Sequence, residues 1–64
     1  MIYVNRLDGK ELIINGLLIE TIESTPDTMI TLTTGRKIIV KQSAEEVIRQ
    51  FEEFIRKTHH IHLK

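Results

Sequence analysis

Hydrophobic and polar residues alternate with a period of two over most of residues 2–41. Such alternation predicts β-strands, because successive side chains of a strand point to opposite faces of a sheet. The segment 28–33 is the clearest case, since Ile30 and Leu32 share one face there and Met29 lies on the other. We predict five strands, at about residues 2–7, 10–14, 18–24, 28–33 and 36–41.

Short turn signals separate these strands. Asp8-Gly9 predicts a type I′ hairpin turn, in which both central residues have positive φ. Gly35 supplies the positive φ of a second hairpin, and Asn15-Gly16 marks a turn before the third strand. Pro26 presets φ for the second residue of a further turn. Strands joined by such short turns pair in the antiparallel direction, so the pattern predicts a five-stranded antiparallel β-meander.

The pattern changes to helical spacing after the fifth strand. Ser43 and Glu46 match a capping box, and the helix is predicted to extend over about residues 44–58. Its apolar stripe consists of Ala44, Val47, Ile48, Phe51, Phe54 and Ile55. Residues 1–58 are therefore predicted to form one α+β domain, a β-meander or partly open barrel with a C-terminal amphipathic helix. Residues 59–64 form a short histidine-containing tail.

Several predicted strands carry apolar residues on both faces. One face is predicted to build the core. The second face holds Tyr3, Leu7, Ile13, Met29 and Ile39. A sheet with one solvated face does not need apolar residues there, so either the sheet curls into a small barrel or these residues meet another copy of the chain. We predict self-association through this second face, together with the helix residues Phe51, Phe54 and Ile55.

Charged residues also lie on the predicted strands. Period two places Glu20 on the same strand face as Ile22, where its carboxylate could form an inter-chain ion pair. The cations of the strands and turns make a candidate basic patch of Arg6, Lys10, Arg36, Lys37 and Lys41. Basic residues on an edge strand discourage edge-to-edge aggregation, and we favour this role for the patch.

Length and composition favour a small, self-associating protein. The chain has 64 residues and no cysteine, and 41% of it is hydrophobic. A core of this size typically leaves only ~3–5 kcal/mol of net stability, and self-association buries more surface. Nine basic and nine acidic residues cancel. This balance argues against nucleic acid as a partner, since nucleic-acid binders usually carry a basic excess.

No segment of the sequence predicts membrane insertion or secretion. No apolar run approaches the ~20 residues that a helix needs to span a bilayer. The N-terminus lacks the long apolar segment of a signal peptide. We therefore expect a cytoplasmic protein.

The three histidines are the candidate metal ligands. His59, His60 and His62 lie close together in the tail. A transition-metal site needs ligands that converge on one point and are held there by further hydrogen bonds, which a frayed tail does not provide. We expect an exposed tail and no metal or other cofactor.

Carboxylate pairs such as Glu45 and Glu46 alternate with bases on the polar face of the helix. No nucleophile–base set is present in the sequence, so we expect that the protein is not an enzyme.

Three stretches carry a family resemblance: MIYVNRLDGKE at residues 1–11, LIETIESTPDT at 18–28 and ITLTTG at 30–35. Over about residues 1–57 the chain resembles the FlbD or SwrD-like family, a group of short bacterial proteins found among flagellar genes. The resemblance implies a cytoplasmic accessory protein of flagellar motility, linked to swarming and to motor power. It implies no catalytic residue and no cofactor.

A protein of this kind is expected to contact further copies of itself and motor, stator or export components at the flagellar base. The alternative is a small RNA-binding regulator, because five short strands followed by a helix are similar in layout to the CsrA family. The basic patch would then meet phosphate groups. The balanced charge argues against this alternative.

Overall fold

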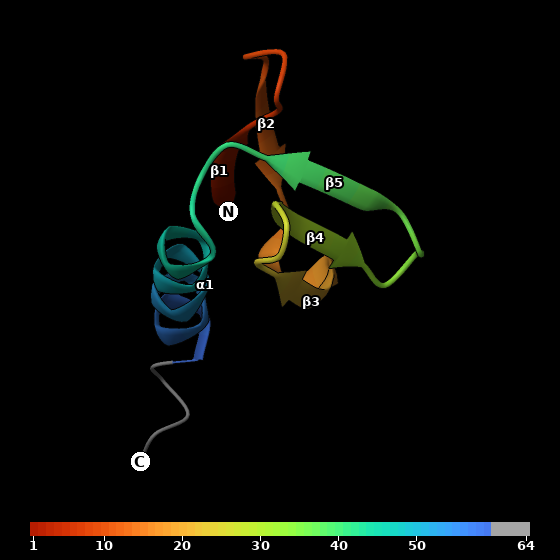
Figure 1. The fold of residues 1–64 in the computed structure, drawn as a ribbon. Coiled ribbons are helices and arrows are strands. Elements are labelled where there is room, and N and C mark those ends of the chain that lie inside the picture. Colours follow the sequence, from red (N-terminus) through yellow and green to blue (C-terminus); the bar gives the residue numbers. More distant parts are fainter. Residues whose placement is uncertain (60–64) are drawn as a thin grey trace.

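The computed structural model describes residues 1–59, which form five antiparallel strands followed by one helix (Figure 1). The elements are β1 (Ile2–Asn5), β2 (Glu11–Ile14), the 3₁₀ turn η1 (Gly16–Leu18), β3 (Ile19–Glu23), β4 (Thr28–Leu32), β5 (Lys37–Val40) and α1 (Ala44–His59). The predicted α+β class, five strands and C-terminal helix are confirmed. The predicted tail ligands His60 and His62, and the side chain of His59, lie outside the described part.

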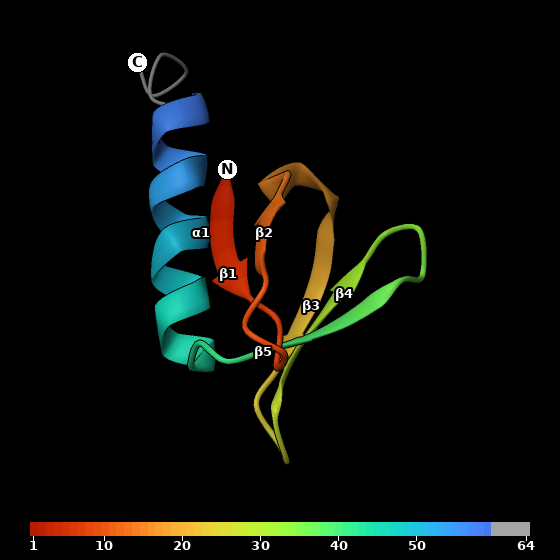
Figure 2. The ribbon, with the colours of Figure 1, turned by 90° about the horizontal axis from the view of Figure 1, so that it is seen from above.

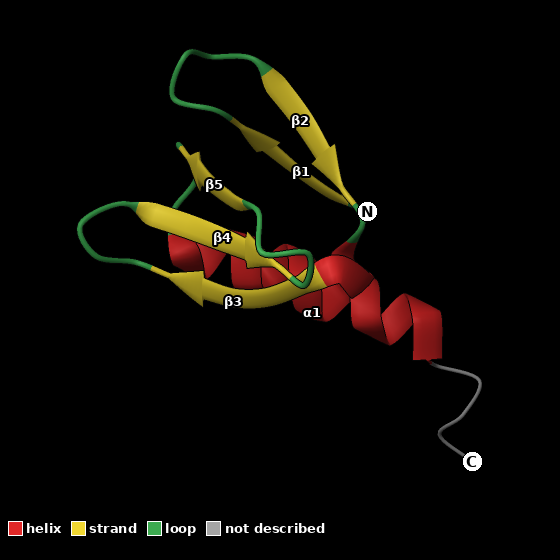
Figure 3. Cartoon of the chain, turned by 90° about the vertical axis from the view of Figure 1, so that its right-hand side faces the viewer, coloured by secondary structure: helices red, strands yellow, loops and turns green. Residues whose placement is uncertain are grey.

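The strands form two open sheets, so the fold is not a closed barrel. One sheet has the order β1-β2 and the other has the order β3-β4-β5. The sheets meet at one corner, where Arg6 forms a bridge with Val40 and the Lys41 N–H donates to the Asn5 carbonyl at 2.8 Å. Figure 3 shows the two sheets diverging from this corner.

The core lies between the two sheets and the helix. Its buried side chains are Ile2, Val4, Ile14, Ile30, Leu32, Ile38, Val40 and Val47. All but Val47 occupy alternate strand positions, so one face of each strand turns inward, as the period-two pattern predicts. The helix lies along β1 and reaches β3 and η1, which covers the open side of the core (Figure 2).

The two hairpin turns share one construction, which differs from the predicted type I′ turn. In the β1–β2 turn, the Arg6 N–H donates to the Lys10 carbonyl and the Gly9 N–H donates to the Arg6 carbonyl, both at 2.8 Å. Among the described residues, positive φ occurs only at glycine, 93° at Gly9 and 95° at Gly35, so the expected positive φ at Asp8 is wrong. These are three-residue loops that end in a left-handed glycine.

A bulge in β3 overturns the predicted placement of Glu20. Ile19 pairs with Leu32, but Thr21 pairs with Thr31, so the register shifts at Glu20. The extra residue breaks the alternation, and it lets Ile19 and Ile22 both pack against the core while Glu20 is exposed. Glu20 and Ile22 therefore do not share a face. In the turn that follows, the Thr25–Pro26 peptide bond is cis.

The start of α1 has the predicted cap. The Ser43 hydroxyl accepts a hydrogen bond from the Glu46 N–H at 3.1 Å. Val47 is fully buried, and Phe51 and Phe54 are partly buried and pack against the core.

Within residues 1–59, no helix has both the length and the apolar character of a bilayer span.

Candidate functional site

Exposed apolar side chains concentrate in the first 18 residues. We call these residues the hairpin surface: Met1, Tyr3, Leu7, Ile13, Leu17 and Leu18. Ile13 is 55% exposed and Leu17 is 59% exposed. Among the described residues, only Ile39 and Ile48 are other large hydrophobic side chains with comparable exposure. Apolar exposure is therefore concentrated at the β1–β2 hairpin and η1.

The pairing of β1 with β2 directs Tyr3 and Ile13 outward. Both strands turn alternate side chains into the core, including Ile2 and Ile14. Tyr3 and Ile13 are directly opposite each other on the remaining face. They form a pair without mutual backbone hydrogen bonds, and in such pairs the side chains lie close together. The outer face of this sheet therefore carries a contiguous aromatic–aliphatic pair.

The turn at one end of the hairpin and η1 at the other end carry the exposed leucines. Leu7 lies in the β1–β2 turn. At the opposite end, Asn15 caps η1, because its Oδ1 accepts a hydrogen bond from the Leu17 N–H at 3.0 Å. This cap fixes Leu17 and Leu18 on the surface, where Leu18 is 40% exposed. Both ends of β2 are therefore flanked by exposed leucine side chains.

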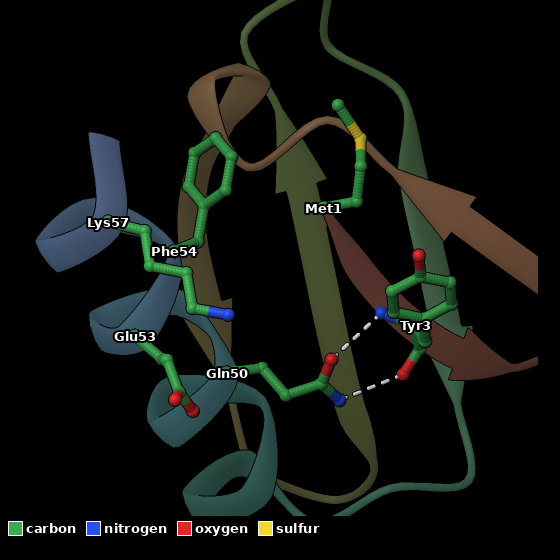
Figure 4. A pocket seen from close by; sticks show the side chains of 6 residues that line it. All are labelled: Met1, Tyr3, Gln50, Glu53, Phe54 and Lys57. Atoms are coloured by element: carbon green, nitrogen blue, oxygen red, sulfur yellow. Dashed lines mark hydrogen bonds between the residues drawn. The ribbon is translucent and has the colours of Figure 1, made fainter.

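Two glutamines cover the free edge of β1. The Gln50 amide accepts a hydrogen bond from the Tyr3 N–H at 2.9 Å and donates to the Tyr3 carbonyl at 2.8 Å (Figure 4). Gln42 accepts from the Asn5 N–H at 2.8 Å and donates to the Asn5 side-chain oxygen at 2.9 Å. An amide side chain presents one donor and one acceptor, as a neighbouring strand does. The β1 edge is therefore closed to another strand.

A shallow pocket lies between the start of β1 and α1 (Figure 4). Its volume is about 230 Å³, and its lining consists of Met1, Tyr3, Gln50, Glu53, Phe54 and Lys57. Small-molecule sites usually measure roughly 300–1,000 Å³. The pocket lies beside the hairpin surface and shares Met1 and Tyr3 with it.

The predicted interface residues do not form one face in the structure. Tyr3, Leu7 and Ile13 are exposed on the β1–β2 hairpin. Met29 and Ile39 pair across β4 and β5, on the outer face of the other sheet, where Met29 is half-buried. In the predicted helix stripe, Phe51 and Phe54 pack against the core and Ile55 is half-buried, whereas Ile48 is exposed. The two open sheets divide the predicted second face into separate surfaces.

The predicted basic patch is also divided. Backbone pairing brings Arg6 next to Lys10 and, through the bridge to Val40, next to Lys41 at the corner where the sheets meet. Arg36 and Lys37 lie at the other end of β5. At about 3.3 Å per residue, a four-residue strand separates these two groups by roughly 13 Å.

Sequence reasoning missed several residues of this site. Gln42 lies just before α1 and Gln50 lies near its middle, and their strand-like pairing with β1 depends on the docking of the helix. Leu17 and Leu18 stand in an apolar run that suggested the start of a strand. The Asn15-Gly16 turn signal in front of them was the available indication that the chain had not yet entered β3.

No group of three or more His, Cys, Asp or Glu side chains that could hold a metal ion occurs among the side chains that the structure describes. The hairpin surface itself consists of apolar side chains.

Comparison with known families gives one match. The family model FlbD, described as flagellar and swarming motility proteins, matches residues 1–59. Comparisons with curated proteins and with solved structures gave no match.

Proposed function

Because this chain belongs to the FlbD family of flagellar and swarming motility proteins, we propose that it is a non-catalytic accessory protein of flagellar motility that acts by binding other proteins. It works in the cytoplasm, near the flagellar base. Its partners are further copies of itself and components of the motor, the stator or the export apparatus.

The observation that carries this proposal is the concentration of exposed apolar side chains on the hairpin surface. Six of the eight exposed large hydrophobic side chains of the described residues belong to it. Single exposed apolar residues are common on soluble proteins, whereas a contiguous group of them marks a site of interaction. Tyrosine is also among the residues enriched at protein interfaces, and Tyr3 lies within this group.

The pocket supports a role in binding over a role in catalysis. A volume of about 230 Å³ suits a side chain of a partner protein better than a substrate and its reacting groups. It also borders Tyr3, so a partner on the hairpin surface can place one side chain in it.

Swarming assays test the proposal. We expect Ile13→Asp and Leu17→Asp to abolish or strongly reduce swarming when each replaces the wild-type copy in cells, because a carboxylate in a closed apolar contact is costly to desolvate. Both side chains are more than half exposed, so the variants are expected to fold normally.

Ile39→Asp and Ile48→Asp are the matched controls. Both introduce the same charge at exposed isoleucines outside the hairpin surface. We expect them to swarm like wild type, provided that immunoblots show equal protein levels. Normal swarming of the hairpin variants, or equal defects in all four, would contradict a contact role for the hairpin surface.

A further inference from the structure

The outer edge of β2 carries backbone groups that no other part of the described chain binds. The Arg6–Lys10 hydrogen bond sets the alternation of the β1–β2 ladder. Hydrogen-bonded pairs therefore include Val4 with Leu12, and the N–H and C=O groups of Glu11 and Ile13 point away from β1. β2 is the outermost strand of its sheet, so these groups face outward.

We propose that a second copy of the chain adds to this edge, with its β2 antiparallel to the first and a two-fold axis at Ile13. The result is a four-stranded sheet with the order β1-β2-β2-β1. This dimer rests on the proposed function, since it specifies how the protein contacts further copies of itself.

The side chains of β2 suit self-pairing about Ile13. With the axis at Ile13, the two Ile13 residues face each other, and each Glu11 faces Asn15 of the second copy. A pairing centred on Glu11 would instead place two carboxylates directly opposite each other, which is destabilising. The outer face then carries a continuous apolar ladder, because Tyr3 is opposite Ile13 in each copy.

The exposed leucines at the two ends of β2 give a second, independent reason. Antiparallel pairing places the turn end of one hairpin beside the η1 end of the other. Leu7 of one copy is thereby brought to the end where Leu17 and Leu18 of the second copy are exposed. A two-fold arrangement repeats this contact at both ends. The hairpin surface becomes self-complementary along its whole length.

The remaining sheet edges suit a second copy less well. The edge of β1 is closed by Gln50 and Gln42. Part of the β5 edge is taken by the Lys41–Asn5 hydrogen bond, and the rest carries the exposed cations Arg36 and Lys37, which would repel their copies.

The β3 edge is interrupted by its bulge. The register shift at Glu20 leaves a short regular segment, and both Glu20 and Glu23 are exposed there. Bulges and edge charges are devices that prevent strand addition. Only the β2 edge combines regular backbone, apolar side chains and no opposed like charges.

Disulfide cross-linking tests the dimer directly, because the chain has no cysteine of its own. Across the proposed axis, the Cα atoms of the two Ile13 residues lie about 5.5 Å apart, within the range of a disulfide. We expect Ile13→Cys to form an intermolecular disulfide under mild oxidation about tenfold or more faster than Ile39→Cys, a control at another exposed isoleucine outside the β2 edge. Equal rates would overturn the proposal.

Ile13→Pro provides the second variant. It removes an N–H that the β1–β2 ladder does not use, and proline is tolerated on a strand edge that faces solvent. We expect Ile13→Pro to be a folded monomer by circular dichroism and light scattering, while Ile13→Thr, which keeps the N–H, remains a dimer. A dimeric Ile13→Pro would overturn the proposal.

These experiments use purified protein and measure only the contact between copies. If cross-linking shows no β2 dimer but Ile13→Asp and Leu17→Asp reduce swarming, the proposed function stands and the hairpin surface binds another protein. A cross-linked β2 dimer with normal swarming of Ile13→Asp would confirm the dimer and contradict a role of the hairpin surface in swarming.

Discussion

Ile30→Ala is expected to remove a large part, or all, of the protein's stability. Ile30 is 0% exposed and pairs with Ile22 and Ile38 in the middle of the three-stranded sheet. Truncating a buried isoleucine to alanine costs about 2–5 kcal/mol, because transfer free energy is lost and a cavity remains. A domain of this size typically has ~3–5 kcal/mol of stability in total. The loss is therefore comparable to the whole stability, and urea denaturation followed by circular dichroism measures it.

Ile39→Ala is the matched control for this prediction. Ile39 lies on the adjacent strand but points to the outer face, where it is 39% exposed. The same truncation is expected to cost below about 1 kcal/mol there. Similar losses in both variants would show that the structure assigns the wrong face of β4 and β5 to the core.

Gly16→Ala is expected to destabilise the protein by about 1–3 kcal/mol through overpacking. A Cβ at this position would lie 2.6 Å from Cδ2 and 2.8 Å from Cε2 of Phe54. Phe54 packs against the core, so its ring must shift or α1 must move away from η1. The loss is measured by chemical denaturation, and the shift by NMR of the Phe54 ring.

A double-mutant cycle isolates the contact between Gly16 and Phe54. In a Phe54→Leu background, Gly16→Ala is expected to cost much less than in the wild type. Gly9→Ala is the control, since a Cβ there meets nothing within 4 Å and its cost comes from positive φ alone. Additive losses for Gly16 and Phe54 would contradict the close approach.

Local patterns were sufficient to predict the secondary structure. Period-two alternation identified the inward residues of each strand, including Ile2 and Ile38, because one sheet face must be apolar to form a core. The capping box identified the start of α1, and the helical spacing of apolar residues identified the side that faces the core. Each of these features depends on neighbours close in sequence.

The arrangement of the elements depends on contacts that are distant in sequence, and here prediction failed. Nothing near Gln50 indicates that its amide pairs with Tyr3, 47 residues away. The β3 bulge at Glu20 satisfies the packing of Ile19 and Ile22 against the core, which is a tertiary requirement. Of the predicted second face, Tyr3, Ile13, Met29 and Ile39 lie on outer sheet faces and Leu7 lies in the β1–β2 turn, and the set is divided because the two sheets diverge.

The structure gives the sheet edges different roles. Glutamine amides close β1, a bulge and acidic residues interrupt β3, and basic residues flank β5. Such features keep small β-proteins from aggregating through their edges. β2 carries the exposed acidic residue Glu11, but no bulge and no glutamine amide covers its edge in the described residues, and it borders the hairpin surface.

Backbone amide exchange at Ile13 tests this central claim most directly, because it requires no substitution. Hydrogen exchange is measured by NMR over a dilution series for the backbone amides of Ile13 and Ile39. The Ile39 N–H is the control, because it also points away from its neighbouring strand at a sheet edge. We predict that Ile13 exchange slows as protein concentration rises, while Ile39 exchange stays fast. Fast Ile13 exchange at every concentration would contradict the assignment of the β2 edge as the contact between copies.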